Sequence, residues 1–250
     1  KQMVKERRNF WLEFDIRNHF KLGPVKYHNV VASIKGTKYP DEYVIISGHL
    51  DSYDVATGGI DCGTGIGPMM EAARMIALSG AKPKRTILFV AFAGEEFGLL
   101  GAKSYVKTHA KELGKIANLF NRDGGPTPPV GISVPQAMYD DFVEVCKPVK
   151  EIRADYPFEV KVAKPFKRPT QSGGTDASVF AVEGVPTFGF NTQDIKGYNF
   201  SYGEIWHTER DLYTKNIPEY QEHAATVTAV VALGIANLSK QLSREGMHKK

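Results

Sequence analysis

Side chains able to bind a metal ion recur in five segments spread along the 250-residue sequence. They are His49 and Asp51 in SGHLDS, Asp61 in GGIDCGTGIG, Glu95 and Glu96 in AFAGEEFG, Asp123 in NLFNRDGG, and His207 in IWHTERD. A mixture of imidazole and carboxylate ligands suits zinc better than magnesium or calcium, which favour shells built of oxygen alone. If these segments meet in space, they could form a zinc site.

Each of these residues also has an ordinary structural explanation when it is taken alone. A histidine after a strand is usually structural, Asp61 could cap the helix that follows it, and Asp123 precedes two glycines, as turn residues often do. Paired glutamates usually lie in a solvated turn, but Glu95 and Glu96 follow seven apolar residues that should bury the preceding strand. The glycine-rich segment around Asp61 could instead cradle a phosphate. However, no lysine follows in the P-loop position, and the aspartate would repel an anion.

The elements that must position these residues follow from hydrophobic patterning. Short apolar runs predict strands at residues 43–46, 87–93 and 116–120, the second of them a central parallel strand buried on both faces. Helices are predicted at residues 64–79, 99–109, 137–145 and 217–242, with Gly80 closing the first and Pro218 in the first turn of the last. This alternation predicts an α/β fold, a doubly wound, mixed and mainly parallel sheet with helices on both faces.

The remaining segments have patterns of their own. Residues 1–8 resemble the end of a helix. Residues 10–20 and 25–36 alternate apolar and polar side chains on either side of a Leu-Gly-Pro turn, which predicts an antiparallel pair with one solvated face. Residues 164–175 are rich in Pro, Lys, Gly and Ser and predict an ordered loop of unusual length. No repeat or composition break marks a boundary, so residues 1–250 are expected to form a single domain.

The predicted topology brings the candidate ligands together. In open α/β sheets, ligands collect at the carboxyl ends of the strands, and three predicted strands end at candidate segments. Asp61, Glu96 and Asp123 together carry three negative charges, and with Glu95 they would repel one another unless cations balanced them. Two divalent ions that share a bridging carboxylate and one hydroxide would balance the three ligand charges closely. The sequence therefore predicts two Zn²⁺ ions.

Composition narrows the possible partners. With 42% hydrophobic and 24% charged residues, the chain fits a soluble globular protein with a sizeable core. The formal net charge of +4 is small, and basic residues crowd near both ends, so a nucleic-acid partner is not expected. No stretch approaches the length of a membrane span, and no apolar signal segment opens the sequence. Two cysteines, Cys62 and Cys146, exclude a disulfide scaffold but allow a single bridge.

With these residues assembled, the sequence resembles the co-catalytic zinc exopeptidases, which include bacterial leucyl aminopeptidase, aminopeptidase Y and carboxypeptidase Q. The likeness runs from about Asn29 to the C-terminal helix and is greatest to the carboxypeptidase Q branch. It is carried by SGHLDSYDVATGGID, RTILFVAFAGEEFGLLGA, the SGGTD loop and WHTERD. The resemblance implies the fold of zinc exopeptidases, a small peptide substrate, and a secreted or periplasmic location.

The family pattern also implies a role for each matching position. The implied metal ligands are the bridging carboxylate Asp61, His49 and Asp123 at one zinc ion, and Glu96 and His207 at the other. Glu95 would be the general base, and Asp51 a carboxylate that orients His49.

The chain departs from the family pattern at one position. The family usually has a second aspartate directly after the bridging one, whereas this chain has Cys62. The thiol changes the local hydrogen bonding and could bind a metal or be oxidised, although a buried, inert cysteine is the commoner outcome. Relatives of this branch also carry an inserted protease-associated domain and further helices upstream. The chain is therefore expected to be a catalytic domain truncated at its N-terminus.

The expected reaction is hydrolysis of a terminal peptide bond. Bound zinc lowers the pKa of water toward about 7, Glu95 accepts the proton and passes it to the leaving amine, and Tyr202 is a candidate donor to the oxyanion. An aminopeptidase needs an acidic group near the free amine, for which Asp176 is a candidate. A carboxypeptidase or dipeptidase needs a cation, for which Arg168 and Arg210 are candidates. Aminopeptidase or dipeptidase activity is favoured.

Two other functions stay open. A glutaminyl cyclase shares this general sheet but works with one zinc ion, and a non-catalytic binding domain could retain the peptidase fold. The full ligand set argues against the first, and the intact Glu95 argues against the second.

Overall fold

A four-stranded sheet in the order β1–β3–β2–β4 forms the middle of the molecule. The computed structural model describes residues 2–19, 21 and 23–247. The strands of this sheet are β1 (Val30–Ile34), β2 (Tyr39–His49), β3 (Arg85–Phe92) and β4 (Ile116–Asn121). β2 runs parallel to β3 and to β4, whereas β1 is antiparallel to β3. The three predicted strands are therefore confirmed, and they are neighbours.

A smaller sheet in the order β6–β5–β7 continues from the first. It consists of β5 (Pro129–Val134), β6 (Glu159–Val162) and β7 (Phe190–Thr192), with β5 parallel to β6 and antiparallel to β7. The residues before β7 run beside β4: the main-chain N–H of Leu119 donates to Pro186 at 2.9 Å. The side chain of Asn118 also exchanges two hydrogen bonds with the main chain of Phe188. This segment joins the edge of the larger sheet to the smaller one.

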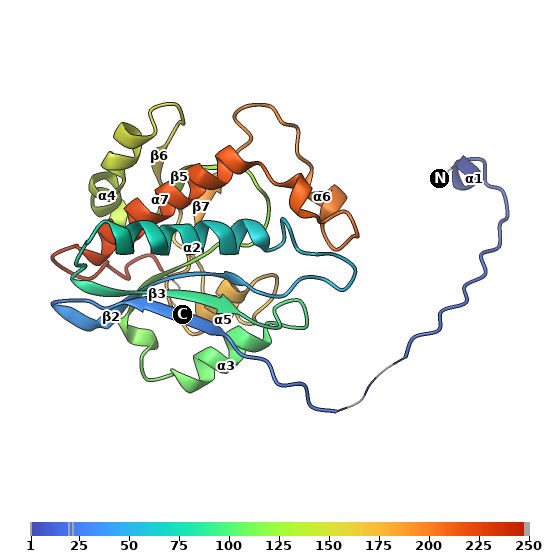
Figure 1. Cartoon of the computed structure of the whole chain (residues 1–250), viewed down its shortest axis with the longest axis horizontal. Coiled ribbons are helices and arrows are strands. Elements are labelled where there is room, and N and C mark those ends of the chain that lie inside the picture. The colour runs from blue at the N-terminus through green and yellow to red at the C-terminus, as the bar shows by residue number, and fades with distance from the viewer. Residues whose placement is uncertain (1, 20, 22, 248–250) are drawn as a thin grey trace.

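Helices cover both faces of the larger sheet, as predicted. They are α1 (Gln2–Lys5), α2 (Gly63–Leu78), α3 (Leu100–Thr108), α4 (Tyr139–Ile152), α5 (Asp176–Val182), α6 (Tyr202–Ile205) and α7 (Pro218–Ala236), with 3₁₀ turns at Leu113–Lys115, Gln136–Met138 and Tyr213–Lys215. α2 and α7 lie against one face with α4 beside α7, and α3 and α5 lie on the opposite face (Figure 1). The fold is thus an α/β arrangement of mixed sheets between layers of helices.

The apolar run of β3 is buried on both of its faces. Ile87, Phe89 and Ala91 join the core beneath α2, α4 and α7. Val90 and Phe92 join the core beneath α3 and α5. Successive side chains of a strand point to opposite faces, which is why an unbroken apolar run is needed here instead of an alternating one.

The last helix is shorter than its pattern predicts. α7 ends at Ala236, so the predicted extension to residue 242 is wrong. Lys84, just before β3, and Arg85, its first residue, bind the carbonyls that follow the helix. Lys84 Nζ donates to Asn237 O at 2.7 Å, and Arg85 Nη1 donates to Leu238 O at 2.6 Å. These bonds replace the helical ones and turn the chain away from the helix axis.

The antiparallel pair predicted for residues 10–20 and 25–36 is wrong. Residues 30–34 do form a strand, but it pairs with β3, from Val30 opposite Ala91 to Ile34 opposite Ile87. Residues 10–19 form no strand and extend away from the sheets (Figure 1); residues 20 and 22 lie outside the described part. The alternating pattern of residues 25–36 thus corresponds to one edge strand. This strand pairs with the free edge of β3 and not with residues 10–19.

Three further features complete the fold. Residues 164–175 form a long connection without a helix or an extended ladder, as predicted. The helix predicted near the start is the single turn α1. In the part of the chain that the structure describes, no helix has the length and apolar character that a membrane span requires.

His223 on α7 should make the protein less stable in mild acid. The ring is fully buried, stacks on Tyr156 at a centroid distance of 3.9 Å, and lies 2.8 Å from Pro129 O through Nε2. Burial lowers the pKa of His223 to about 4. Between that value and the ordinary one, the unfolded chain binds a proton that the folded protein does not, so stability falls as the pH falls.

From about pH 7 to about pH 5 this single group should remove about 2 kcal/mol of unfolding free energy. Urea unfolding at both pH values measures the loss of unfolding free energy in the wild type and in His223→Gln. Other titrating groups contribute equally to both proteins, so the difference between the two losses reports on His223. Equal losses in the two proteins would show that His223 does not contribute.

Candidate active site and metal centre

The candidate residues follow the carboxyl ends of three neighbouring strands. His49 is the last residue of β2. Glu95 and Glu96 come just after β3, and Asp123 comes just after β4. Because β2 lies between β3 and β4 and is parallel to both, all of these side chains arrive at the same edge of the sheet.

His49 lies between two carboxylates. Its Nε2 atom is 2.9 Å from Asp61 Oδ1 and 3.4 Å from Asp123 Oδ1, and the ring is almost fully buried. On its other side, Nδ1 is 2.9 Å from the main-chain oxygen of Asp51. A neutral ring that donates from Nδ1 to this carbonyl has its free lone pair on Nε2, directed at the two carboxylates. This is how a histidine that shares a cation with two carboxylates is oriented.

Glu96 and His207 form a second pair of candidate ligands. His207 Nε2 lies 2.9 Å from Glu96 Oε2. The Glu96 side chain is 3% exposed, and its other oxygen is buried without a hydrogen-bond partner among the described residues. Tyr53 stacks on the His207 ring at a centroid distance of 4.1 Å and an interplanar angle of 3°, which holds the plane of the imidazole. An unpartnered buried carboxylate oxygen beside an imidazole is a donor set that fits a cation.

Asp61 lies between these two groups. Its Oδ1 atom faces His49, and its Oδ2 atom accepts a hydrogen bond of 2.8 Å from the Tyr202 hydroxyl. Ligand atoms of His49, Asp61 and Glu96 lie within 4.8 Å of one another. Asp61 is not a helix cap, because α2 has Cys62 at its N-cap position and no side-chain capping bond. The peptide bond between Asp61 and Cys62 is cis.

Asp51 supports the site through its main-chain carbonyl and through its side-chain carboxylate. Its carbonyl holds Nδ1 of His49, as described above, whereas its carboxylate lies 3.8 Å from that nitrogen. The two carboxylate oxygens accept the main-chain N–H groups of Glu95 and Glu96, each at 3.1 Å. Asp51 therefore fixes both His49 and the turn that carries the two glutamates.

Burial and neighbouring aspartates raise the pKa values of the two glutamates. Burial and the charge of Asp123 raise the pKa of Glu95 to about 8. Burial and the charge of Asp61 likewise raise the pKa of Glu96. For His49, burial acts to lower the pKa, but its bonds to Asp123 and Asp61 outweigh burial and raise it well above the ordinary value. Cations among these carboxylates would relieve the repulsion, which is the electrostatic signature of a metal centre.

Cys62 also belongs to this group of side chains. Ligand atoms of His49, Cys62 and Asp123 lie within 4.8 Å of one another. The side chain is 2% exposed, and its thiol donates to the main-chain oxygen of Arg122 at 3.1 Å. Burial raises the pKa of the Cys62 thiol. The second cysteine, Cys146, is buried in α4 and is free, so the bridge that the sequence allowed is not formed.

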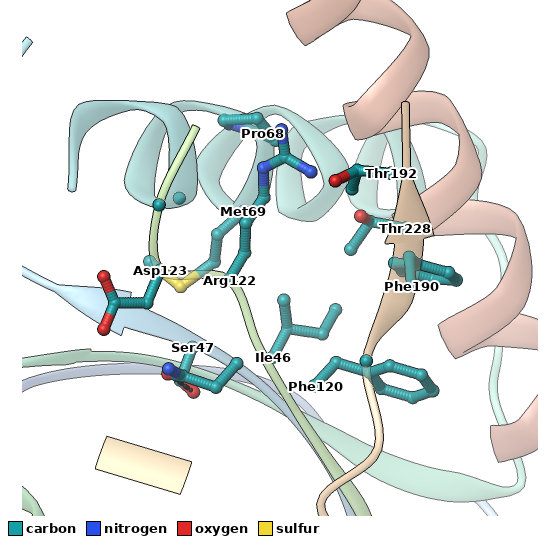
Figure 2. A pocket seen from close by; sticks show the side chains of 14 residues that line it. Ile46, Ser47, Pro68, Met69, Phe120, Arg122, Asp123, Phe190, Thr192 and Thr228 are labelled. Atoms are coloured by element: carbon teal, nitrogen blue, oxygen red, sulfur yellow. Dashed lines mark hydrogen bonds between the residues drawn. The ribbon is translucent and has the colours of Figure 1, made fainter. Parts of the chain in front are cut away.

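Arg122 and Asp123 follow β4 and point in different directions. The Asp123 carboxylate points away from a small cavity beneath α2, whereas the Arg122 guanidinium extends toward α2 (Figure 2). Arg122 Nε donates to Thr64 O at 2.7 Å, and Nη2 donates to Thr127 O at 3.0 Å. Burial lowers the pKa of Arg122 to about 10. This buried cation ties the loop of Asp123 to the first turn of α2.

A cleft of about 570 Å³ opens beside these residues. Its lining comprises Asp61, Glu95, Glu96, Asp123, Tyr202, Trp206 and His207, together with Gly98, Leu99, Lys103 and residues 172–175. Part of the long loop predicted from the sequence therefore faces the cleft. Asn121 Nδ2 holds this loop by donating to Thr175 Oγ1 at 2.6 Å.

Three side chains that were predicted to contact the substrate do not line the cleft: Asp176, Arg168 and Arg210. Asp176 is fully buried at the start of α5 and does not line the cleft; burial raises its pKa to about 7. Arg168 donates to Val182 O, and Arg210 pairs with Glu209 at 3.9 Å; neither lines the cleft. Of the lining residues that the structure describes, Lys103 on α3 is the only lysine or arginine.

Sequence reasoning missed the residues that support the site. Asp211, which is 3% exposed, accepts the main-chain N–H groups of Ile60 at 2.7 Å and Asp61 at 3.1 Å. Its place at the end of WHTERD was the available signal. Tyr53 and Lys103 gave no comparable signal, because nothing in the local pattern separates them from surface residues.

Comparison with known proteins gives a consistent result. The profile of Peptidase family M28 matches residues 29–231. Carboxypeptidase Q from Rattus norvegicus is 32% identical over 231 residues, covering 90% of this chain and 46% of that protein. The chain thus spans about half the length of the curated relatives it matches.

Solved structures share the fold. The crystal structure of a Peptidase M28 precursor from Shewanella amazonensis SB2B has a TM-score of 0.70 at 32% identity, covering 86% of this chain and 46% of that one. BSAP, a zinc aminopeptidase from Bacillus subtilis, has a TM-score of 0.63 at 21% identity, covering 88% and 53% respectively, and shows likeness of fold.

Replacing Asp211 by alanine should destabilise the protein by about 2–4 kcal/mol, because two buried N–H groups lose their acceptor. Asp211→Asn keeps one acceptor oxygen and should lose about half as much. Urea unfolding measures both. An unchanged midpoint for Asp211→Ala would mean that this carboxylate does not hold the turn of Asp61.

Proposed function

The chain belongs to peptidase family M28, and on this premise we propose that it is a catalytic domain that hydrolyses terminal peptide bonds of small peptides with zinc. The observation that carries the proposal is the convergence of histidines and carboxylates from separate loops on one cleft, with Glu95 beside them. The zinc metalloprotease and aminopeptidase activities named for relatives support the same chemistry.

In this proposal two zinc ions share the site. The residues that would hold them are His49 and Asp123 for one ion, Glu96 and His207 for the other, and Asp61 for both. When bound, zinc polarises the scissile carbonyl and makes water a stronger acid. Glu95 takes the proton of the attacking water and returns it to the leaving amine.

Tyr202 has a more limited role than an oxyanion donor. Its hydroxyl carries one proton, which it donates to Asp61 Oδ2. Burial and the charge of Asp61 raise the pKa of Tyr202, so the hydroxyl keeps this proton. Tyr202 therefore orients Asp61, and it could stabilise an oxyanion only by exchanging this bond.

The cleft favours a dipeptide substrate. Its acidic wall can receive a free amine, and Lys103 can receive a free carboxylate. A dipeptide presents both groups within a short span. Turnover of dipeptides and of aminoacyl-p-nitroanilides, with and without added zinc, tests this assignment and separates an enzyme from a binding domain. Secretion remains a prediction.

A glutaminyl cyclase is the second candidate function. It would use one zinc ion, whereas the proposed peptidase would use two. Metal analysis of the purified protein separates the two, because the proposal requires two ions per chain. The second pair of candidate ligands, Glu96 and His207, favours the two-ion arrangement.

Glu95→Gln should leave zinc binding unchanged and lower kcat by at least about 100-fold, because the amide cannot accept the proton. Metal analysis and steady-state kinetics on a dipeptide are the measurements. A variant with two bound zinc ions and full activity would remove Glu95 from this role.

Lys103→Met should raise KM for a dipeptide by about tenfold, because the carboxylate of the substrate loses its charged partner. The same dipeptide with an amidated C-terminus should be affected little. Lys107→Met is the matched control, since Lys107 lies on the same helix but does not line the cleft. If Lys103→Met and Lys107→Met behave alike, Lys103 does not read the carboxylate.

A further inference from the structure

The sulfur atom of Cys62 lies where it could coordinate a metal ion bound by His49 and Asp123. Ligand atoms of these three residues lie within 4.8 Å of one another, so one ion could contact all of them. Zinc binds thiolate sulfur at about 2.3 Å and imidazole nitrogen at about 2.0–2.1 Å, which is compatible with such spacing. The group includes both residues proposed for one of the two ions.

The main chain around Cys62 keeps its sulfur atom on the side of His49 and Asp123. A Cβ atom on Gly65 would lie 2.5 Å from Cys62 Sγ, and one on Gly48 would lie 3.1 Å away. The sulfur is thus packed directly against two glycines. The thiol makes a weak hydrogen bond to Arg122 O at 3.1 Å. Coordination of a metal ion would replace this weak bond.

The charges around Cys62 are also compatible with a thiolate ligand. Three carboxylate ligands and one thiolate carry four negative charges, which equals the formal charge of two divalent cations when the water molecule at the site is neutral. The guanidinium of Arg122 donates hydrogen bonds to main-chain oxygens of Thr64, Gly125 and Thr127. It also interacts electrostatically with Cys62. In the described part of the chain this guanidinium forms no ion pair with a carboxylate, so its charge is available to the thiolate.

We propose that Cys62 is a metal ligand, so that one ion is bound by His49, Asp61, Asp123 and the Cys62 thiolate. On binding, the S–H bond is replaced by a sulfur–metal bond, and the proton passes to the solvent. The inference rests on the metal centre proposed above and adds a sixth ligand to it.

This ligand makes the two metal positions chemically different. The position with Cys62 contains a soft donor and should prefer zinc, cobalt or cadmium to manganese or magnesium. The position of Glu96 and His207 contains only nitrogen and oxygen donors. The two positions should therefore fill in sequence, the Cys62 position first.

Cobalt titration of the metal-free protein tests the proposal without measuring activity. A thiolate bound to Co²⁺ gives an intense near-ultraviolet charge-transfer band, whereas nitrogen and oxygen ligands do not. The wild type should develop this band fully with the first equivalent of Co²⁺. Cys146→Ala, which removes the other buried thiol, should behave identically.

Cys62→Ser and Cys62→Asp should bind Co²⁺, as measured by metal analysis, without the band. Cys62→Asp restores the residue that the resembling family carries, and circular dichroism verifies the fold of each variant. An X-ray absorption spectrum of the zinc-loaded wild type needs no variant and should contain a sulfur neighbour at about 2.3 Å.

The outcomes separate this inference from the proposed function. If the wild type binds two metal ions and hydrolyses peptides but shows neither the band nor a sulfur neighbour, Cys62 is not a ligand and the function stands. If Cys62→Asp retains the band, the sulfur comes from elsewhere and the inference is wrong. If the wild type binds no metal ion, both proposals are wrong.

Discussion

Repulsion among carboxylates at one edge of the sheet is the constraint on which the rest of the site depends. Asp61, Glu96 and Asp123 are largely buried and lie near one another, where water screens their charges poorly. Their ion-pair partners in the described part of the chain are His49 and His207, with no lysine or arginine among them. Cations would balance acids that are gathered in this way, and one buried oxygen of Glu96 has no hydrogen-bond partner among the described residues.

Main-chain hydrogen bonds keep these acids in place. Asp211 holds the turn of Asp61, Asp51 holds the turn of the two glutamates, and Arg122 ties the loop of Asp123 to α2. Each of these side chains is itself partly or fully buried. Because each acts on the backbone, it fixes the position of a loop and not one side chain alone. Such support lets residues on loops keep the geometry that catalysis requires.

The parts of this structure that could be predicted were those that local pattern encodes. The unbroken apolar run of β3 identified a buried strand, and the acids directly after it were therefore expected at the sheet edge. The partner of β1 was not predictable, because alternation specifies a half-buried strand but not the edge it joins. Lys103 was missed for a similar reason: it reaches the cleft only because α3 packs beside the glutamate turn, and no local signal reports that packing.

The most direct test of the metal centre is anomalous diffraction from a crystal of the zinc-loaded protein, recorded on both sides of the zinc absorption edge. Two peaks about 3.5–4 Å apart, one beside His49 and Asp123 and the other beside Glu96 and His207, are expected. A single peak, or zinc bound away from Asp61, would contradict the two-ion centre.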